Sequence, residues 1–198
     1  MARPRSAGYD AQREAILGAA VHAFSEIGYP SASMSQLARS CGVSKATLYH
    51  YFDSKEALLF EALRRHTAEL LALVRDAADR APPGPARWAS VVRALMPAYR
   101  RARVFHAALI NDVKFLPAEE RGIIVAQQRA VVDAIAAVLN EAFPDRIPPA
   151  RLKPVTMALL GMLNFSFAWL RPDGPMSHEE FGELALSLSL HGLAGAPP

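Results

Sequence analysis

The sequence predicts an all-α protein of about nine helices, in which three short N-terminal helices are joined by a long fourth helix to a larger helical domain. Apolar residues recur every three or four positions through most of the chain, which is the spacing of helices with one buried face. Capping signals precede several of these stretches, and no pair of segments has the pattern of a β-hairpin. We place the domain boundary after residue 55, which gives domains of residues 1–55 and 56–198.

The three N-terminal helices are marked by their ends. The first ends at Gly28 and has an apolar face made of Ile16, Ala20, Ala23, Phe24 and Ile27. Ser33 and Gln36 form a capping box at the start of the second helix, which stops at Gly42. Ser44 caps the third helix, which runs to Tyr51.

A long fourth helix follows the corner at Phe52, with a fresh capping signal at residues 53–56. It ends before the proline-rich segment of residues 81–85, which forbids a helix. In the next helix Trp88 and Leu95 lie on one stripe, and Pro97 is expected to end or kink it. Further helices are predicted over residues 104–116 and from Pro117 to Ala142.

The last two predicted helices differ in character. Residues 154–170 are apolar nearly all round, so a helix there must be covered on more than one side. Ser177 to Glu180 forms a capping box before the last segment. That segment also shows a strand-like alternation between Leu184 and Leu190, but the cap favours a helix.

Two short helices joined by a glycine-containing turn are typical of a helix-turn-helix, which places its second helix in the major groove of DNA. Here the second helix would expose side chains that suit phosphates and base edges: Ser44, Lys45, Thr47, Tyr49, His50 and Tyr51. Ala46 and Leu48 are predicted to pack inward. The alternative is an ordinary helical hairpin with a polar, solvated face.

The stretch Ser33 to Leu58, SMSQLARSCGVSKATLYHYFDSKEAL, closely resembles the DNA-binding signature of the tetracycline-repressor (TetR) family, and the likeness extends back to Ile16. The resemblance implies a repressor that a small effector releases from a palindromic operator in double-stranded DNA. It also implies a homodimer formed by the last two helices, which would cover residues 155–170. The positions that the family uses against DNA correspond here to Ser35, Ser44, Lys45, Thr47, Tyr49, His50, Tyr51 and Lys55. Of these, Ser35 and His50 fall on variable positions.

The effector is suggested by a basic stretch and two short resemblances. Five arginines and no acidic residue lie between Arg87 and Arg103, which indicates either a solvated face, favoured for Arg87 and Arg93, or an anionic ligand. The segments LINDVKFLPAEER, from Leu109, and GMLNFSFAWLRPDGP, from Gly161, resemble parts of TetR regulators that sense acyl-coenzyme A thioesters. A fatty acyl-coenzyme A or phenylacetyl-coenzyme A is such a ligand.

The second resemblance implies a ligand site of ten residues. Coenzyme phosphates would meet Arg100, Arg103 and Lys114, and the acyl group would be surrounded by Phe105, Leu109, Met162, Phe165 and Trp169. The amides of Asn111 and Asn164 are candidates for a ligand carbonyl. For each apolar residue the alternative is packing in the core or the dimer. A regulator of an efflux pump that senses a hydrophobic drug is the alternative for the whole protein.

Other classes of protein are disfavoured. No phosphate-binding glycine loop or nucleophile elbow is present, and the six histidines lack metal-ligand spacing, so we expect no enzyme, cofactor or metal. A helical adaptor would differ from a regulator by lacking salt-dependent DNA binding. The single cysteine, Cys41, and a polar N-terminus without a visible signal peptide suit the cytoplasm. Residues 155–170 fall short of the roughly 20 that a membrane span requires, so no membrane association is expected.

Overall fold

The structure is a computed structural model that describes residues 7–144, 146–171 and 173–195. All regular secondary structure in this part of the chain is helical: ten α-helices, of which α9 is a single turn, and two short 3₁₀ helices. The predicted all-α class is therefore confirmed. The described residues form two compact units, one made of residues 7–66 and 107–124 and the other of residues 67–106 and 125–195.

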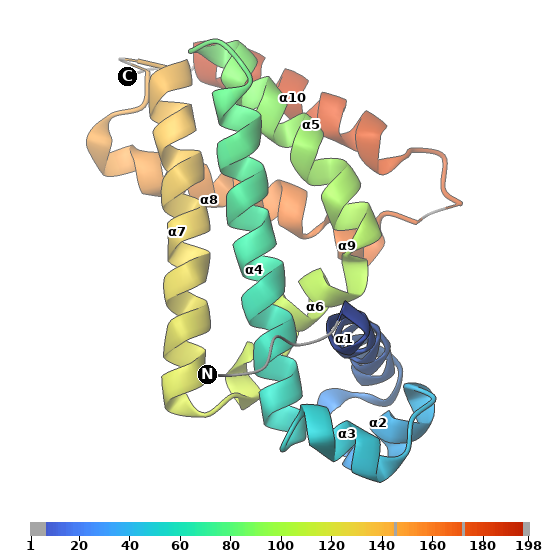
Figure 1. The fold of residues 1–198 in the computed structure, drawn as a ribbon. Coiled ribbons are helices and arrows are strands. Elements are labelled where there is room, and N and C mark those ends of the chain that lie inside the picture. Colours follow the sequence, from blue (N-terminus) through green and yellow to red (C-terminus); the bar gives the residue numbers. More distant parts are fainter. Residues whose placement is uncertain (1–6, 145, 172, 196–198) are drawn as a thin grey trace. The chain divides into compact units, whose positions relative to one another are not determined.

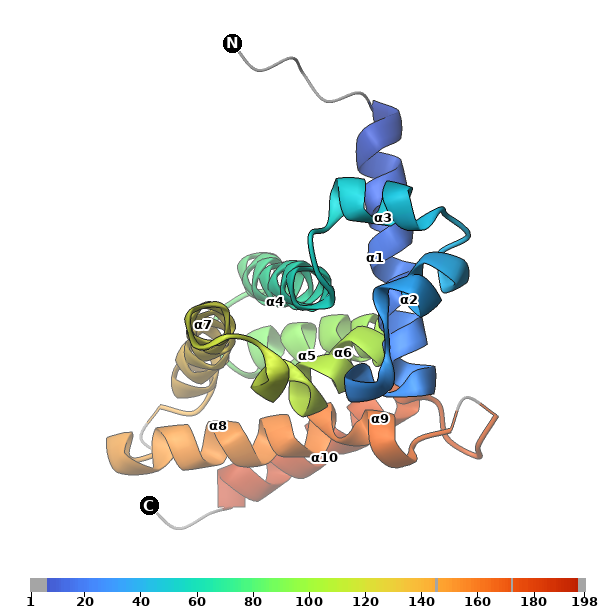
Figure 2. The same cartoon turned by 90° about the horizontal axis from the view of Figure 1, so that it is seen from below.

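The first unit is built on α1 (Ala7–Ile27), α2 (Met34–Ser40) and α3 (Lys45–Tyr51), followed by the start of α4 (Lys55–Asp79). Figure 2 shows α2 and α3 lying across α1, and α2 packs against both of the other helices. Gly28, with φ of +84°, turns the chain out of α1 into the 3₁₀ helix η1 (Tyr29–Ser31). This backbone conformation is one that side-chain-bearing residues avoid, so glycine sets the corner.

The helix starts in this unit follow the predicted caps. The Ser33 hydroxyl accepts from the Gln36 amide, and the Gln36 side chain accepts from the Ser33 amide, which completes a capping box on α2. The Ser44 hydroxyl caps α3 by accepting from the Thr47 amide. The Ser54 hydroxyl does the same for the Ala57 amide at the start of α4. The core beneath contains the fully buried Ile16, Leu37, Leu48, Leu58 and Leu59.

A segment from much later in the chain completes the first unit. It comprises the end of α6 (Arg103–Asn111), the 3₁₀ helix η2 (Val113–Phe115) and the start of α7 (Ala118–Ala142). Phe115 stacks on Tyr29 with ring centroids 5.2 Å apart and planes 21° apart. The helix-turn-helix unit therefore includes residues more than 80 positions beyond Tyr29.

In the second unit α5 (Pro85–Arg101) runs beside α10 (His178–Gly195), as Figure 1 shows. Trp88 on α5 is buried and donates its indole N–H to the Ser189 hydroxyl on α10 at 2.9 Å. Pro97 was expected to end or kink this helix, and the helix does not end there, because α5 continues to Arg101. Burial of Met96 and Tyr99 on either side holds this helix against its neighbours and offsets the lost hydrogen bond.

The apolar stretch predicted as one helix is divided in two. It forms α8 (Pro149–Asn164) and the short α9 (Ser166–Trp169), with Phe165 between them. Figure 2 shows α8 alongside α10, with which it packs. Large apolar side chains remain open on these helices: the exposed fractions are 50% for Met157, 43% for Leu184 and 56% for Leu188. The stretch is thus only partly covered within one chain.

One described helix, α7, is long and apolar enough to cross a membrane by length and composition alone, and 28% of its most apolar 18-residue window is buried. This helix is not the stretch at residues 155–170 that the hydropathy pattern first suggested. Its start belongs to the first unit and its remainder to the second. Core helices of soluble proteins pass the same test, so the observation is weak evidence for a membrane.

Candidate DNA-binding and effector sites

The outer face of α3 is the candidate surface for DNA. Leu48 is fully buried and anchors this short helix, while Lys45, Tyr49 and His50 are exposed. The Lys45 ammonium lies 5.8 Å from the centre of the Tyr49 ring. Ala46 was expected to pack inward but is exposed, because it lies three and four positions before Tyr49 and His50 on the same face.

Several predicted DNA-contacting side chains already have partners within the first unit. The Ser44 and Thr47 hydroxyls lie 2.7 Å apart as part of the cap on α3. The Tyr51 hydroxyl donates to the Gln12 side chain at 2.8 Å. Ser35 is half-buried at the start of α2. These contacts fix the directions of the Ser44, Thr47 and Tyr51 side chains.

Sequence reasoning missed the part of α1 that lies beside α3. The Tyr9 ring lies 4.6 Å from the Tyr51 ring and meets His50 edge-on at 6.1 Å. Together with the Gln12 contact, this aromatic group supports the C-terminal end of α3. Tyr9 and Gln12 precede the first apolar repeat by several residues, and nothing local in the sequence marks them as neighbours of residues 50 and 51.

Lys55, predicted to contact DNA, lies at the start of α4 with its ammonium turned toward the corner between α1 and α2. It donates to the backbone carbonyls of Tyr29, Pro30 and Ala32, each at 3.2 Å. The same ammonium lies 4.7 Å from the centre of the Tyr29 ring. Its position is therefore defined by the protein itself.

The ten residues predicted for the effector are divided between the two units. Leu109, Asn111 and Lys114 belong to the first unit, where Leu109 is buried and the other two are exposed. The other seven belong to the second unit: Arg100, Arg103, Phe105, Met162, Asn164, Phe165 and Trp169. Of these, Arg100, Arg103, Phe165 and Trp169 are exposed. The Trp169 ring meets Phe181 edge-on at 5.0 Å.

A group of polar side chains, buried except for the half-buried Asn164, lies in the second unit at the break between α8 and α9. The Tyr99 hydroxyl donates to the Asn164 side-chain oxygen at 2.7 Å. His106 is buried and stacks on the Tyr99 ring at 4.3 Å, and this burial lowers the pKa of His106 from 6.5 to about 4. The Ser166 hydroxyl is buried without a hydrogen-bond partner. Only Asn164 of these residues was predicted from the sequence.

Arginines of α5, and Arg103 at the start of α6, find acidic or carbonyl partners from elsewhere in the second unit. Arg87 pairs with Glu141 at 2.6 Å and Arg100 with Glu179 at 3.1 Å. Arg103 donates to the Phe167 carbonyl at 2.8 and 3.0 Å. The stretch contains no acidic residue of its own, but most of its arginines therefore have a partner from another part of the second unit.

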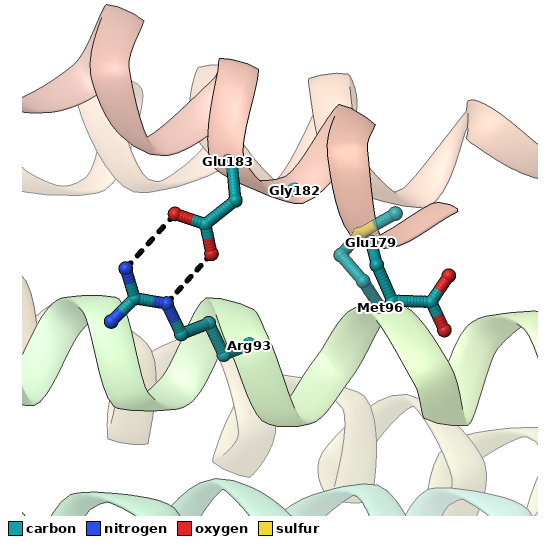
Figure 3. Close-up of a pocket in the computed structure, with 5 residues that line it drawn as sticks. All are labelled: Arg93, Met96, Glu179, Gly182 and Glu183. Atoms are coloured by element: carbon teal, nitrogen blue, oxygen red, sulfur yellow. Dashed lines mark hydrogen bonds and ion pairs between the residues drawn. The ribbon is translucent and has the colours of Figure 1, made fainter. Parts of the chain in front are cut away.

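Arg93 forms a two-pronged ion pair with Glu183, with nitrogen–oxygen distances of 2.6 and 2.9 Å (Figure 3). This pair lines a cleft of about 180 Å³ between α5 and α10, together with Met96, Glu179 and Gly182. Figure 3 shows the Arg93 and Glu183 side chains reaching toward each other from the two helices. The cleft is small, and no residue predicted for the effector lines it.

Two family models match the chain. The model for bacterial regulatory proteins of the tetR family matches residues 16–62, and the model for the tetracyclin repressor-like C-terminal domain matches residues 82–193. The chain belongs to the TetR family. It is a DNA-binding transcription regulator and not an enzyme, as expected, and its helix-turn-helix binds operator DNA.

Similar TetR proteins cover nearly the whole chain. The transcriptional activator FasR of Mycolicibacterium smegmatis is 26% identical over 189 residues, which are 95% of this chain and 85% of FasR. A TetR-family regulator from Bordetella parapertussis has a structure with a TM-score of 0.85 and 29% identity, covering 94% of this chain and 97% of that one.

AibR, solved in complex with isovaleryl coenzyme A and operator DNA, has a TM-score of 0.80 and 23% identity, covering 89% of this chain and 97% of AibR. At that identity the likeness concerns the fold alone.

Proposed function

We propose that this TetR protein is a cytoplasmic, ligand-responsive repressor of a palindromic operator, with residues 1–55 contacting DNA and residues 56–198 serving effector binding and dimerisation. The observation that carries the DNA-binding part is the exposed face of the capped helix α3, with Leu48 buried beneath Lys45 and Tyr49. Lys45 suits a phosphate or a guanine, and the Thr47 methyl suits a thymine.

The site on DNA is tested by selecting an operator from random duplexes and measuring its affinity over a range of salt concentrations. We expect a two-fold symmetric site and a linear fall of log affinity with log salt. In the Lys45→Met variant the salt slope should shrink by about 0.9 if Lys45 neutralises one phosphate. The exposed Lys153→Met, on α8, is the matched control and should leave the slope unchanged. A slope that does not depend on Lys45 would contradict its assignment.

The proposed homodimer uses the open faces of α8 and α10. Met157, Leu184 and Leu188 are each exposed by two fifths or more, and such apolar side chains on adjoining helices favour a partner surface. A second copy offers the same surface, as two-fold symmetry requires. Two copies would also supply two recognition helices, one for each half-site.

Light scattering tests the dimer. We expect twice the 21.5 kDa mass of the chain for the wild type and the single mass for Leu188→Glu. Ile123 on α7 is exposed to a similar degree as Leu184, so Ile123→Glu is the control and should remain dimeric. A monomeric wild type would contradict the dimer without touching the DNA-binding assignment.

For the effector we propose an acyl-coenzyme A thioester, such as phenylacetyl-coenzyme A or a fatty acyl-coenzyme A. The resemblance of residues 109–121 and 161–175 supports it, as does the ligand seen in AibR. Arg100 would exchange its exposed pairing with Glu179 for a phosphate, and Arg103 would assist. The buried Tyr99 and Ser166 and the half-buried Asn164 offer hydrogen bonds for a thioester carbonyl.

The effector is tested by adding isovaleryl-, phenylacetyl- and palmitoyl-coenzyme A to the operator complex, with free coenzyme A as the control. We expect one thioester to change operator affinity at least about tenfold, which is the scale of ordinary allosteric coupling. Arg100→Gln should weaken this response. Arg93→Gln, which removes a similar exposed pair with a glutamate of α10, should not. No response to any thioester would exclude this effector class and favour a hydrophobic drug.

Activation is the second candidate for the direction of regulation, because FasR is an activator and is similar along nearly the whole chain. A reporter gene placed behind the selected operator distinguishes the two. Repression predicts higher reporter expression when the protein is deleted, and activation predicts lower expression.

A further inference from the structure

The corner between α1 and α2 is held by a lysine that comes from α4. The Lys55 ammonium has three N–H donors, and three backbone carbonyls lie within 3.2 Å of it, those of Tyr29, Pro30 and Ala32. Acceptors and donors therefore match in number. A phosphate could be bound directly only at the expense of one of these bonds.

The three carbonyls belong to the segment that places α2. Ala32 directly precedes Ser33, whose hydroxyl and amide form the capping box of α2. Since α2 packs against α3, the position of Ser33 determines where the recognition helix lies within this unit. Lys55 holds one end of this arrangement from the first turn of α4.

The same corner has an apolar anchor that does not depend on Lys55. Tyr29 is 3% exposed, packs against Phe24 at 5.0 Å and stacks on Phe115 at 5.2 Å. Its hydroxyl donates to Glu56 at 3.2 Å. These contacts keep the segment folded when the ammonium is removed, so loss of Lys55 should loosen the corner rather than unfold the unit.

We propose that Lys55 is a positioning residue for operator binding, which fixes the Tyr29–Ala32 corner and through it α2 and α3, and that it does not neutralise a DNA phosphate. This assignment differs from the role that the family resemblance implies for the residue. It concerns the DNA-binding unit alone and is independent of the effector and of the direction of regulation.

The salt dependence of binding distinguishes the two roles. With an operator duplex selected from random DNA, Lys55→Met should bind about tenfold more weakly at every salt concentration, with the slope of log affinity against log salt unchanged. The free variant should also melt at a lower temperature, because three carbonyls lose a charged donor. If Lys55 instead contacts a phosphate, the slope should be smaller by about 0.9 and the melting temperature should be unchanged.

Lys55→Arg provides a second test in case Lys55→Met does not fold. It keeps the positive charge for a phosphate, but its planar guanidinium does not reproduce the three-carbonyl geometry of an ammonium. Positioning predicts weaker binding at constant slope, whereas a phosphate contact predicts affinity near that of the wild type. A smaller slope in Lys45→Met would show that the assay detects a lost phosphate contact. A reduced slope in Lys55→Met, or full affinity in Lys55→Arg, would overturn the proposal.

Discussion

Replacing His106 by phenylalanine should remove a large part of the acid sensitivity of this protein. His106 is 3% exposed and stacks on Tyr99, and burial lowers its pKa to about 4. In the unfolded chain its pKa returns to 6.5. Between these values a proton binds only the unfolded state, so folding stability is lost as the pH falls from 6.5 toward 4. His106 therefore costs about 2 kcal/mol by pH 5 and about 3 kcal/mol by pH 4, relative to pH 7.

The assay is urea unfolding of the wild type and His106→Phe at pH 7 and pH 5. Phenylalanine keeps an aromatic ring against Tyr99 but does not titrate. We expect the wild type to lose about 2 kcal/mol more than the variant over this interval. Burial also lowers the pKa of His178, and that contribution remains in both proteins. The exposed His22→Gln is the control and should retain the wild-type acid sensitivity. Equal losses in His106→Phe and the wild type would refute the assignment of a buried, neutral His106.

Three further changes test the packing, a cap and a surface ion pair. Gly182→Ala should lower the unfolding free energy by about 1–3 kcal/mol, because the added methyl would lie 2.8 Å from the Met96 side chain. An unchanged denaturation midpoint would contradict the close approach of α5 and α10. Ser33→Ala removes the cap of α2 and should cost about 1 kcal/mol in urea unfolding, with weaker operator binding; unchanged values of both would show that the cap is dispensable. Arg93→Ala should alter the melting temperature little, because its pair with Glu183 is more than half exposed on both sides and is worth at most about 1 kcal/mol; a large shift would show a greater role for this pair.

The candidate DNA-binding surface could be predicted from the sequence to a large extent. The errors of this prediction concern single residues. Three of its features depend only on residues three or four positions apart, so a short stretch of sequence is enough to predict them. These are the caps at Ser33 and Ser44 and the corner at Gly28. Ala46 was placed on the wrong side because a small apolar residue suits a core and a DNA surface equally. Lys55 is part of a motif of the family, so a role in DNA binding could be predicted. The carbonyls that accept from its ammonium lie 23 to 26 positions earlier in the chain, so this contact could not.

The effector region was less predictable because its informative contacts are distant in sequence. The arginines of α5 indicated either a solvated face or an anionic ligand, whereas in the structure three of them pair with Glu141, Glu179 and Glu183 from other helices. Pro97 was expected to end or kink α5, yet the helix does not end there, and residues on both sides of the proline are buried. No pattern around Tyr99 or His106 indicated that they would meet Asn164 and Phe167.

The all-α class, the helix-turn-helix and the starts of its helices could be predicted from the sequence alone, because hydrophobic period, caps and glycine corners act over one or two turns. The pairing of the charges, the apolar faces that stay exposed and the direction of the Lys55 ammonium became known from the fold. These depend on residues brought together across tens of positions, where folding selects one arrangement from many that the same composition allows. The recognition helix was therefore visible in the sequence, and what holds it in place was not.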